Sequence, residues 1–303
     1  MAHGELVAAF PGQGSLAPGV GAPWLHHVAF DAVLSVAEAT GTDLAGLLVD
    51  GTEDELVSTR NAQLATFALS LCILDATGIA EQCGWMLGHS LGEYTAVVAS
   101  SMVSRAEGVR LVDARGTAML EASSAQPGGL VALIGGDAAA ASAACELIPG
   151  LAVANHNGPG QIVIGGPNGA LDELGARAKE FGFRRAIPLR VGGAFHTPLM
   201  APAAMPLRAA LDSTTFSAAR ATLVANVDGA AHPDPADWPR LLERQLTEPV
   251  DWERCISTLP LGATVVECGP GGVLAGLIRR IRDDLRCVVI SAPQDLDQLE
   301  GTS

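Results

Sequence analysis

The segment at residues 86–99, MLGHSLGEYTAVVA, constrains the fold more than any other part of the chain. A short apolar stretch, GWML, precedes Gly88 and is consistent with a buried strand, and the residues from about 91 to 100 predict a helix. Gly88, Ser90 and Gly92 match the pattern Gly-x-Ser-x-Gly of a nucleophile elbow, a tight strand-to-helix turn that exposes a serine hydroxyl. Side chains would collide at so tight a bend, which explains the two glycines. The alternative is an ordinary helix start with Ser90 as its N-cap.

Three further segments predict elements around this turn. Residues 5–10, ELVAAF, predict a short strand that ends at the turn PGQG, a common place for free backbone donors. Residues 53–79 and 104–123 have helical periodicity, and Ser104 is a candidate N-cap for the second of these helices. Arg115 falls in the middle of that helix, where an arginine is usually on the surface or in an ion pair.

Residues 129–191 show a different pattern. Strands are predicted at 129–135, 151–157, 161–166 and 184–191, and helices at 137–147 and 169–183. The order β-α-β-β-α-β is that of a ferredoxin-like unit. We therefore expect an α/β protein with a small subdomain at 127–192, inserted into a larger body formed by residues 1–126 and 193–303.

A serine at its ordinary pKa is a weak nucleophile and needs a base. Of the seven histidines, His89 is fixed on the elbow next to the serine, and His156 belongs to the inserted subdomain. His196, in GGAFHTPLM, follows the return from that subdomain into the main body, where a cleft is expected. The sequence favours His196 over His156 as the base, and a structural histidine is the alternative for either.

Composition excludes several classes of protein. The chain has 303 residues, 49% of them hydrophobic and 17% charged, which is typical of a globular protein. Its net charge of −15 disfavours nucleic acid as a partner. The longest apolar run, residues 65–74, is about half the length needed to cross a bilayer, and no basic segment precedes the first apolar residues. We expect a cytoplasmic protein that binds neither membrane nor nucleic acid.

The six cysteines have no close spacing, which predicts reduced thiols and neither a disulfide framework nor a metal site. No P-loop is present, and GPGGVLAG fails the dinucleotide pattern at its last glycine. No metal and no cofactor are therefore expected.

Several segments carry a family resemblance, and they follow one another in the family's order. They are FPGQGS at 10–15, GHSLGEY at 88–94, RLVDARGTAM at 110–119, NGPGQIVIGG at 157–166, GAFHTPLM at 193–200, RQLTEPVDW at 244–252 and ECGPGGVLAGLIRR at 267–280. In these segments the chain resembles the malonyl-CoA:acyl-carrier-protein transacylases and the acyltransferase domains of polyketide synthases. The resemblance implies an α/β-hydrolase-like body with an inserted ferredoxin-like subdomain.

The resemblance also implies roles for single residues. Ser90 would carry the acyl group, and His196 would be the general base. The N–H groups of Gln13 and Leu91 would form the oxyanion hole. The remaining implied roles are Arg115 as the partner of a malonyl carboxylate, Gln63 and Phe195 as pocket residues, and Gln245 as the residue whose main-chain carbonyl orients the imidazole.

The chain departs from the family pattern at two positions. Leu16 stands where the family commonly has glutamine, and Gly272 stands where it usually has a basic residue. Phe195, by contrast, resembles the members that accept malonyl, since those selective for methylmalonyl typically have serine there.

The resemblance implies coenzyme A thioesters and an acyl carrier protein as partners. Because carrier proteins are acidic, docking needs a local basic patch. Candidates for it are Arg184, Arg185, Arg279, Arg280 and Arg282.

The predicted function is transfer of a malonyl or related acyl group from coenzyme A to an acyl carrier protein through an acyl-serine, with no cofactor beyond the substrate's own pantetheine arm. Three alternatives stay open. They are a hydrolase of acyl thioesters, a carrier-to-carrier transferase of an unusual acyl group in polyketide biosynthesis, and an inactive carrier-binding scaffold.

Overall fold

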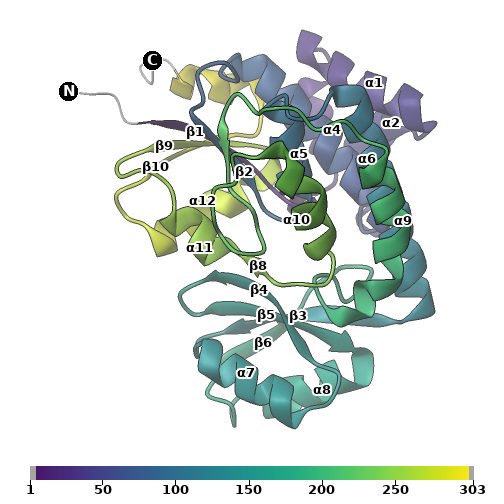
Figure 1. The fold of residues 1–303 in the computed structure, drawn as a ribbon, viewed down its shortest axis with the longest axis vertical. Helices are drawn as coiled ribbons and strands as arrows, with labels where there is room; N and C mark the ends of the chain where they lie inside the picture. Colours follow the sequence, from purple (N-terminus) through teal and green to yellow (C-terminus); the bar gives the residue numbers. More distant parts are fainter. Residues whose placement is uncertain (1–4, 300–303) are drawn as a thin grey trace.

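A computed structural model describes residues 5–299 of the chain as an α/β fold with two sheets (Figure 1). The large sheet has the strand order β10-β9-β1-β2-β7, and all its pairings are parallel. Its strands are β1 (Leu6–Phe10), β2 (Trp85–Gly88), β7 (Thr222–Leu223), β9 (Thr264–Cys268) and β10 (Arg286–Ile290). The central strands β1 and β2 are continuously apolar, as expected for a parallel sheet that is covered on both faces.

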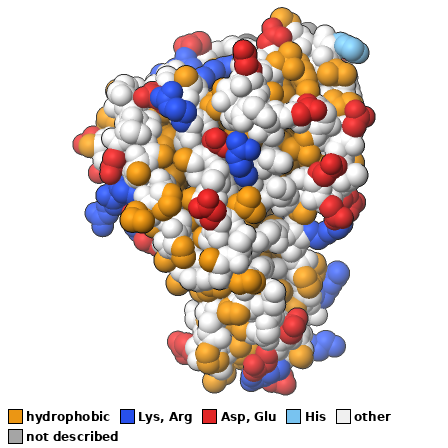
Figure 2. Space-filling model, turned by 90° about the vertical axis from the view of Figure 1, so that its right-hand side faces the viewer, with side chains coloured by type: hydrophobic (Ala, Val, Ile, Leu, Met, Phe, Trp, Pro, Cys, Tyr) orange, Lys and Arg blue, Asp and Glu red, His pale blue; other side chains and the backbone are white. Residues whose placement is uncertain are grey.

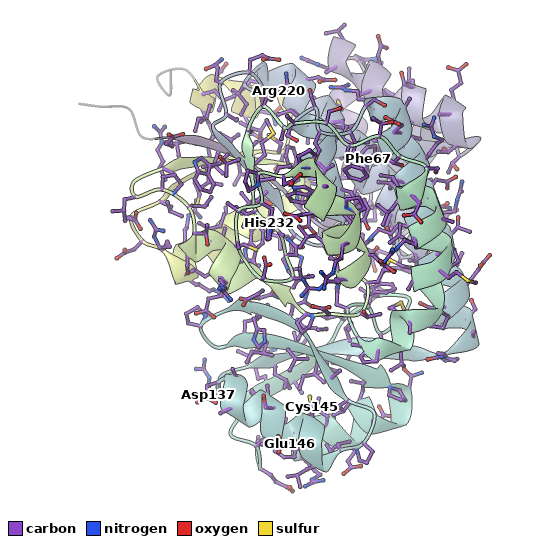
Figure 3. All side chains as sticks on the ribbon, viewed as in Figure 1. Phe67, Asp137, Cys145, Glu146, Arg220 and His232 are labelled. Carbon is purple, nitrogen blue, oxygen red and sulfur yellow. The ribbon has the colours of Figure 1, made fainter. Side chains whose placement is uncertain are left out.

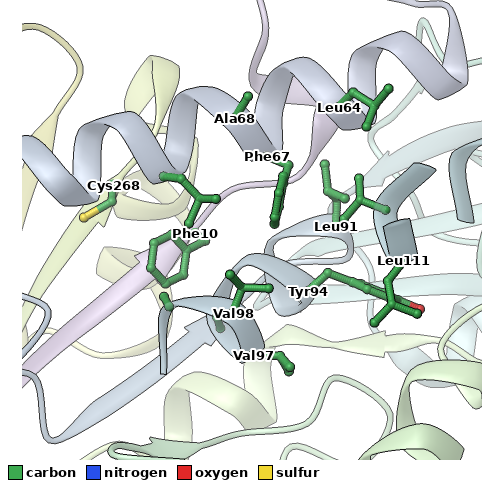
Figure 4. Close-up of a cluster of buried hydrophobic side chains, with 14 of the residues drawn as sticks. Phe10, Leu64, Phe67, Ala68, Leu91, Tyr94, Val97, Val98, Leu111 and Cys268 are labelled. Atoms are coloured by element: carbon green, nitrogen blue, oxygen red, sulfur yellow. The ribbon is translucent and has the colours of Figure 1, made fainter. Parts of the chain in front are cut away.

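Helices cover this sheet and complete the large body. They are α1 (Asp31–Thr40), α2 (Leu44–Asp50), α3 (Glu53–Leu56), α4 (Thr59–Thr77), α5 (Leu91–Ala99), α6 (Arg105–Ala125), α9 (Ala201–Asp212), α10 (Trp238–Arg244), α11 (Trp252–Ser257) and α12 (Val273–Ile281). Figure 4 shows the core where α4 and α5 pack against β1, with Phe67 of α4 between Phe10 and Leu91. This packing holds the start of α5, which follows the elbow, against the centre of the sheet.

The helical periodicity of residues 53–79 is confirmed over most of that range, but it belongs to two helices. Thr52 and Glu55 form a capping box that starts the short helix α3, and the chain leaves helical geometry at Ser58 before α4 begins at Thr59. The helix predicted at 104–123 is confirmed as α6, with Ser104 as the N-cap that accepts a hydrogen bond from Glu107 N–H.

The small sheet has the order β6-β3-β5-β4-β8. Its elements are β3 (Gly128–Ile134), α7 (Ala138–Leu147), β4 (Ala152–Gly158), β5 (Gln161–Pro167), α8 (Asn168–Arg177) and β6 (Arg185–Pro188). This confirms the predicted β-α-β-β-α-β order. Asp137 caps α7 by accepting from Ala140 N–H at 2.9 Å, and Cys145 lies on the same helix (Figure 3). The helix predicted at 169–183 ends earlier, at Arg177, and a turn follows with Gly182 at φ 86°.

Successive side chains along the strands of the small sheet point to opposite faces, and each face packs into a different hydrophobic core. Leu130 and Val163 face the core of the large body, whereas Val131 and Ile164 pack with α7 and α8. The fifth strand, β8 (Val250–Asp251), comes from the C-terminal part of the chain and pairs with β4 in parallel. The sequence did not predict this strand. The division of the chain at residues 127 and 192 stays our proposal, and β8 is the part of the later chain that joins the two sheets.

No helix within residues 5–299 is long and apolar enough to cross a membrane.

Candidate active site

The turn between β2 and α5 has the geometry of a nucleophile elbow. Ser90 has φ 53° and ψ −110°, a backbone conformation that residues other than glycine rarely adopt. A Cβ on Gly88 would lie 2.0 Å from the carbonyl carbon of Gly92, and a Cβ on Gly92 would lie 1.9 Å from the main-chain oxygen of Phe10. Both glycines are therefore required by close backbone contact, as the motif predicted.

A residue that the sequence did not indicate stabilises this strained turn. Asn226 Oδ1 accepts the Ser90 N–H at 2.8 Å, and Asn226 Nδ2 donates to the Gly88 main-chain oxygen at 2.7 Å. Asn226 is fully buried, and 136 residues separate it from Ser90. An asparagine in a loop carries no periodic signal, so only the structure could place it here.

The structure brings His196 to the serine. Its Nε2 lies 2.7 Å from Ser90 Oγ, and its Nδ1 lies 2.6 Å from the main-chain oxygen of Gln245. Because a carbonyl oxygen only accepts, Nδ1 carries the proton and Nε2 is free to accept the serine proton. His156 lies on β4 and makes no hydrogen bond to Ser90 among the contacts of the described residues.

His196 is 3% exposed, and this environment favours its neutral form. Burial is the main cause that lowers the pKa of His196 to about 3, and the positive charge of Arg115 adds to it, while the hydrogen bond to Gln245 acts in the opposite direction. A neutral imidazole is the form that can act as a base.

Arg115 lies fully buried in the middle of α6, next to the serine. Its Nη1 donates to Gln63 Oε1 at 2.5 Å, and its Nη2 donates to Gln245 Oε1 at 2.9 Å and to Ser90 Oγ at 3.3 Å. Its Nε has no hydrogen-bond partner among the described residues, and its Cζ lies 5.0 Å from the centre of the Tyr94 ring. Burial lowers the pKa of Arg115, because the charge has left water without gaining a direct ionic partner.

No carboxylate within residues 5–299 lies within ion-pair distance of Arg115. Buried charges are normally paired, since an unpaired one costs several kcal/mol. A buried guanidinium with neutral partners and an unused N–H has the chemistry of a site for an incoming anion.

Glu93, on α5, is a second buried charged residue near the serine, and it is 1% exposed. Its Oε1 accepts the Asn226 N–H at 2.8 Å, and its Oε2 accepts a short hydrogen bond from Gln245 Nε2. Burial raises the pKa of Glu93 to about 8, against the opposing effect of these two donors and of Arg115. An acidic residue inside the apolar helix that follows the elbow was visible in the sequence, but its partners were not.

A cleft of about 510 Å³ leads to Ser90 and His196 between the two sheets. The large body contributes Gln13, Leu16 and Phe195 to its walls, and the small sheet contributes Leu130 and Asn157. His89 also borders the cleft and bonds to Asn157 through Nε2 at 2.9 Å.

Arg115 and Gln63 are not among the residues that line this cleft; they lie beneath Ser90. Gln63 also donates to Met119 Sδ at 3.4 Å and so has both of its polar atoms occupied. A carboxylate that reaches Arg115 therefore either binds its unpaired Nε or replaces one of the present contacts of its Nη atoms.

The two residues expected to form the oxyanion hole both start helical turns beside Ser90. Leu91 is the first residue of α5, and Gln13 is the first residue of the short turn at 13–15. The first N–H groups of a helix have no acceptor within the helix, so these donors suit an anionic oxygen.

The two departures from the family pattern have simple structural outcomes. Leu16 adds apolar surface to the cleft wall. Gly272 is the N-cap of α12 with φ 64°, a left-handed conformation in which glycine is unstrained.

Of the residues proposed for carrier docking, Arg184, Arg185, Arg279 and Arg280 are exposed. Arg280 Nη1 donates to Gln161 Oε1 at 3.1 Å, and Gln161 borders the cleft. On the face in Figure 2, acidic and basic side chains are intermixed and form no single large basic surface.

Arg282 behaves differently from the other four arginines. Its Nε and Nη2 each lie 2.6 Å from Asp284, and its Nη1 donates to the Leu259 main-chain oxygen at 3.2 Å. Because these contacts hold it to its own loop, we remove Arg282 from the predicted docking set.

No group of three or more histidine, cysteine, aspartate or glutamate side chains in the described part of the chain could hold a metal ion. The six cysteines are all unpaired, and Cys72, Cys83, Cys255 and Cys268 are buried.

A serine–histidine pair on a nucleophile elbow, in an α/β-hydrolase-like body with a ferredoxin-like small subdomain, is typical of enzymes that transfer or hydrolyse acyl groups. The family model described as acyl transferase domain matches residues 7–290. The chain belongs to this acyltransferase family.

Similar proteins and structures agree with this assignment. The chain is 36% identical to the malonyl CoA-acyl carrier protein transacylase of Bacillus subtilis, over 97% of this chain and 95% of that protein. It is 37% identical to the one of Salmonella typhimurium, over 96% and 97%. The crystal structure of the malonyl-CoA:acyl carrier protein transacylase of Xanthomonas oryzae has a TM-score of 0.90 at 34% identity and covers 98% of both chains. A malonyl-transacylase solved in complex with a type II PKS acyl-carrier protein has a TM-score of 0.91 at 32% identity and covers 97% of this chain and 98% of its own.

Proposed function

We propose that the protein transfers a malonyl group from malonyl-CoA to the pantetheine thiol of an acyl carrier protein. The observation that carries this proposal is Arg115, a fully buried guanidinium that has only neutral hydrogen-bond partners and an unpaired Nε. Its Nη2 lies 3.3 Å from Ser90 Oγ, so an acyl group on the serine can place a distal carboxylate against it. An acyl group without a free carboxylate, such as acetyl, would leave the charge of Arg115 without an ionic partner.

The first half-reaction loads the serine. Ser90 Oγ attacks the thioester carbonyl carbon while its proton passes to His196 Nε2, and the N–H groups of Gln13 and Leu91 stabilise the negative oxygen. The C–S bond then breaks, and the coenzyme A sulfur takes the proton from Nε2. The product is a malonyl ester of Ser90.

The second half-reaction unloads it. His196 removes the proton of the carrier thiol, the sulfur attacks the ester carbonyl, and Ser90 Oγ leaves and regains a proton from Nε2. The main-chain oxygen of Gln245 orients the imidazole throughout, in the place of the acidic residue of a hydrolase triad. No cofactor takes part in this scheme.

The pocket residues act by limiting space and water. Phe195 is 4% exposed and borders the cleft next to His196, and Leu16 adds an apolar wall. Gln63 positions Arg115 by accepting from its Nη1, while the Nη2 of Arg115 contacts the serine. An apolar cleft that the acyl chain fills disfavours water as the second nucleophile.

Two other activities use the same serine. A hydrolase would release malonate, and a carrier-to-carrier transferase would accept an unusual acyl group from a second carrier protein. Arg115 favours malonyl over a neutral acyl group. We place the protein in the cytoplasm, which the six unpaired cysteines support.

The experiment is intact-protein mass spectrometry after incubation with malonyl-CoA, followed by addition of an acyl carrier protein. We expect one malonyl group on the wild-type chain, none on Ser90→Ala, and malonyl-carrier as the main product. Free malonate as the main product identifies a hydrolase, and labelling that persists in Ser90→Ala refutes the assignment of the nucleophile.

A further inference from the structure

Glu93 is a buried charged side chain close to the nucleophile, and the mechanism above gives it no role. It lies in the first turn of α5, three residues after the nucleophile, and each of its oxygens accepts one N–H group. One donor is the Asn226 N–H and the other is Gln245 Nε2. Burial raises the pKa of Glu93, but both of its oxygens face N–H donors, and a proton on either oxygen would point a donor at a donor. We therefore assign the carboxylate form from this hydrogen-bond geometry.

Gln245 connects Glu93 to the arginine. Its Nε2 donates to the Ser90 main-chain oxygen at 2.8 Å and to Glu93, so the amide nitrogen faces acceptors. Its Oε1 faces Arg115 Nη2 at 2.9 Å, and a guanidinium has only donors. The amide therefore has one orientation that satisfies every partner, and the carboxylate of Glu93 is one of the groups that select it.

We infer that Glu93 is a positioning residue that fixes the orientation of the Gln245 side-chain amide and thereby directs its oxygen to Arg115. This inference rests on the proposed function, because the effect of Glu93 on Arg115 is measured as a change in the preference for a malonyl over an acetyl group. Glu93 touches neither Ser90 Oγ nor the position of the acyl group, and it acts through Gln245.

The same carboxylate also reaches the other side chain that holds the elbow. Asn226 donates its N–H to Glu93 while its side chain binds Ser90 N–H and the Gly88 oxygen. Through Asn226, Glu93 affects acylation by every thioester, whereas through Gln245 it affects acyl groups that carry a carboxylate. The two effects can be separated by comparing substrates.

Glu93→Gln is the sharpest change, because it keeps the size of the side chain and replaces one acceptor by a donor. If the oxygen of the introduced amide keeps the Asn226 N–H, the NH₂ group of that amide faces the NH₂ group of Gln245. This conflict weakens the preference for the present orientation of the Gln245 amide. In molecules where that amide turns over, its NH₂ group faces Arg115 and its oxygen faces the Ser90 main-chain oxygen. The guanidinium then loses the Gln245 acceptor and keeps only the Gln63 acceptor, so it is held less firmly beside the serine.

The experiment measures kcat/KM for serine acylation by malonyl-CoA and by acetyl-CoA in the wild type, Glu93→Gln and Arg115→Ala. We expect Glu93→Gln to lower the malonyl-to-acetyl ratio by about tenfold, the size of one lost hydrogen bond to a charged group. Glu267→Gln is the matched control. Glu267 is 1% exposed and accepts the N–H groups of Leu274 and Ala275, so its loss should lower stability and leave the ratio unchanged.

A double-mutant cycle with Gln245→Met tests the route. Methionine keeps the main-chain oxygen that binds His196 and removes the side-chain hydrogen bonds to Arg115, to Glu93 and to the Ser90 main-chain oxygen. We expect Gln245→Met to lower the ratio as Glu93→Gln does, and the double variant to lower it no further. Additive effects on the ratio, or an equal loss of both substrates in Glu93→Gln, overturn the inference.

Two outcomes separate the inference from the proposed function. If Arg115→Ala loses the malonyl preference and Glu93→Gln keeps it, the inference alone fails. If Arg115→Ala keeps the preference, both fail. If circular dichroism shows that Glu93→Gln does not fold, Gln245→Met tests the inference in its place. A folded Gln245→Met with the malonyl-to-acetyl ratio of the wild type would show that the Gln245 side chain does not position Arg115.

Discussion

Arg115 Nη2 lies 3.3 Å from Ser90 Oγ, the same oxygen that lies 2.7 Å from His196 Nε2. One hydroxyl therefore accepts from a guanidinium and donates to an imidazole. The positive charge favours the serine in its deprotonated form and disfavours a protonated His196, whose pKa it helps to lower. In the proposed mechanism, Arg115 therefore acts on the base as well as on the acyl group.

The pH dependence of acylation should reflect this environment. A folded pKa of about 3, below the usual 6.5, keeps His196 neutral and able to accept a proton throughout the range in which an ordinary histidine becomes charged. We expect the single-turnover rate with acetyl-CoA, which has no titrating carboxylate, to change less than about twofold between roughly pH 5.5 and 8. An acylation rate that falls as the pH is lowered, with a midpoint near pH 6.5, would show that the imidazole of His196 is exposed to water in solution.

Removal of the base should slow the reaction strongly. We expect His196→Ala to lower the acylation rate by about two to four orders of magnitude, the usual range for general-base catalysis. His156→Ala is the matched control, because His156 lies on β4 and should leave the rate close to that of the wild type. The reverse result would make His156 the base.

The second glycine of the elbow should be required for stability. A Cβ at position 92 would lie 1.9 Å from the Phe10 main-chain oxygen, and the backbone on both sides is held in the sheet and in α5. We expect Gly92→Ala to lower the free energy of unfolding by about 1–3 kcal/mol or more. In Gly175→Ala, on α8, the new methyl group meets nothing within 4 Å, and helix propensity predicts a gain of about 0.5–1 kcal/mol. Urea unfolding of both variants checks the pair, and equal effects would contradict the close contact.

The sequence predicted the parts of this site that depend on local pattern. The Gly-x-Ser-x-Gly spacing located the elbow, and periodicity located α6 and the β-α-β-β-α-β order of the small subdomain. The contacts among Glu93, Gln245 and Asn226 were not predictable, because they join residues 133 and 152 positions apart. The two-residue strand β8 is too short to show alternation, and the continuous helical periodicity of residues 53–79 hides the break that the capping box at Thr52 introduces.

Carrier docking should depend on the four exposed arginines proposed for it, of which Arg280 contacts Gln161 at the border of the cleft. Charge reversal of Arg279 and Arg280, alone or with Arg184 and Arg185, should raise KM for the carrier protein and leave KM for malonyl-CoA nearly unchanged, because only the carrier presents an acidic surface. Arg110→Glu is the matched control, an exposed arginine of α6 that does not border the cleft. Equal increases for both substrates would assign these arginines to the phosphates of coenzyme A.

Arg115 decides whether the site is built for a carboxylate. A charge-assisted hydrogen bond is worth about 1.5–3 kcal/mol, which corresponds to roughly ten- to a hundredfold in specificity. Arg115→Ala should therefore lose malonyl transfer by at least about that factor. The rate of acetyl transfer should stay the same or rise in this variant. The reason is that the methyl group of an acetyl ester cannot pair with the buried charge of Arg115, and the variant lacks that charge. The measurement is kcat/KM for malonyl-CoA and acetyl-CoA, with transfer to the carrier followed by mass spectrometry. If the wild type prefers a neutral acyl thioester and Arg115→Ala keeps its malonyl activity, Arg115 is structural. The enzyme is then a carrier-to-carrier transferase, in which the guanidinium supports Gln63 and Gln245 and binds no substrate.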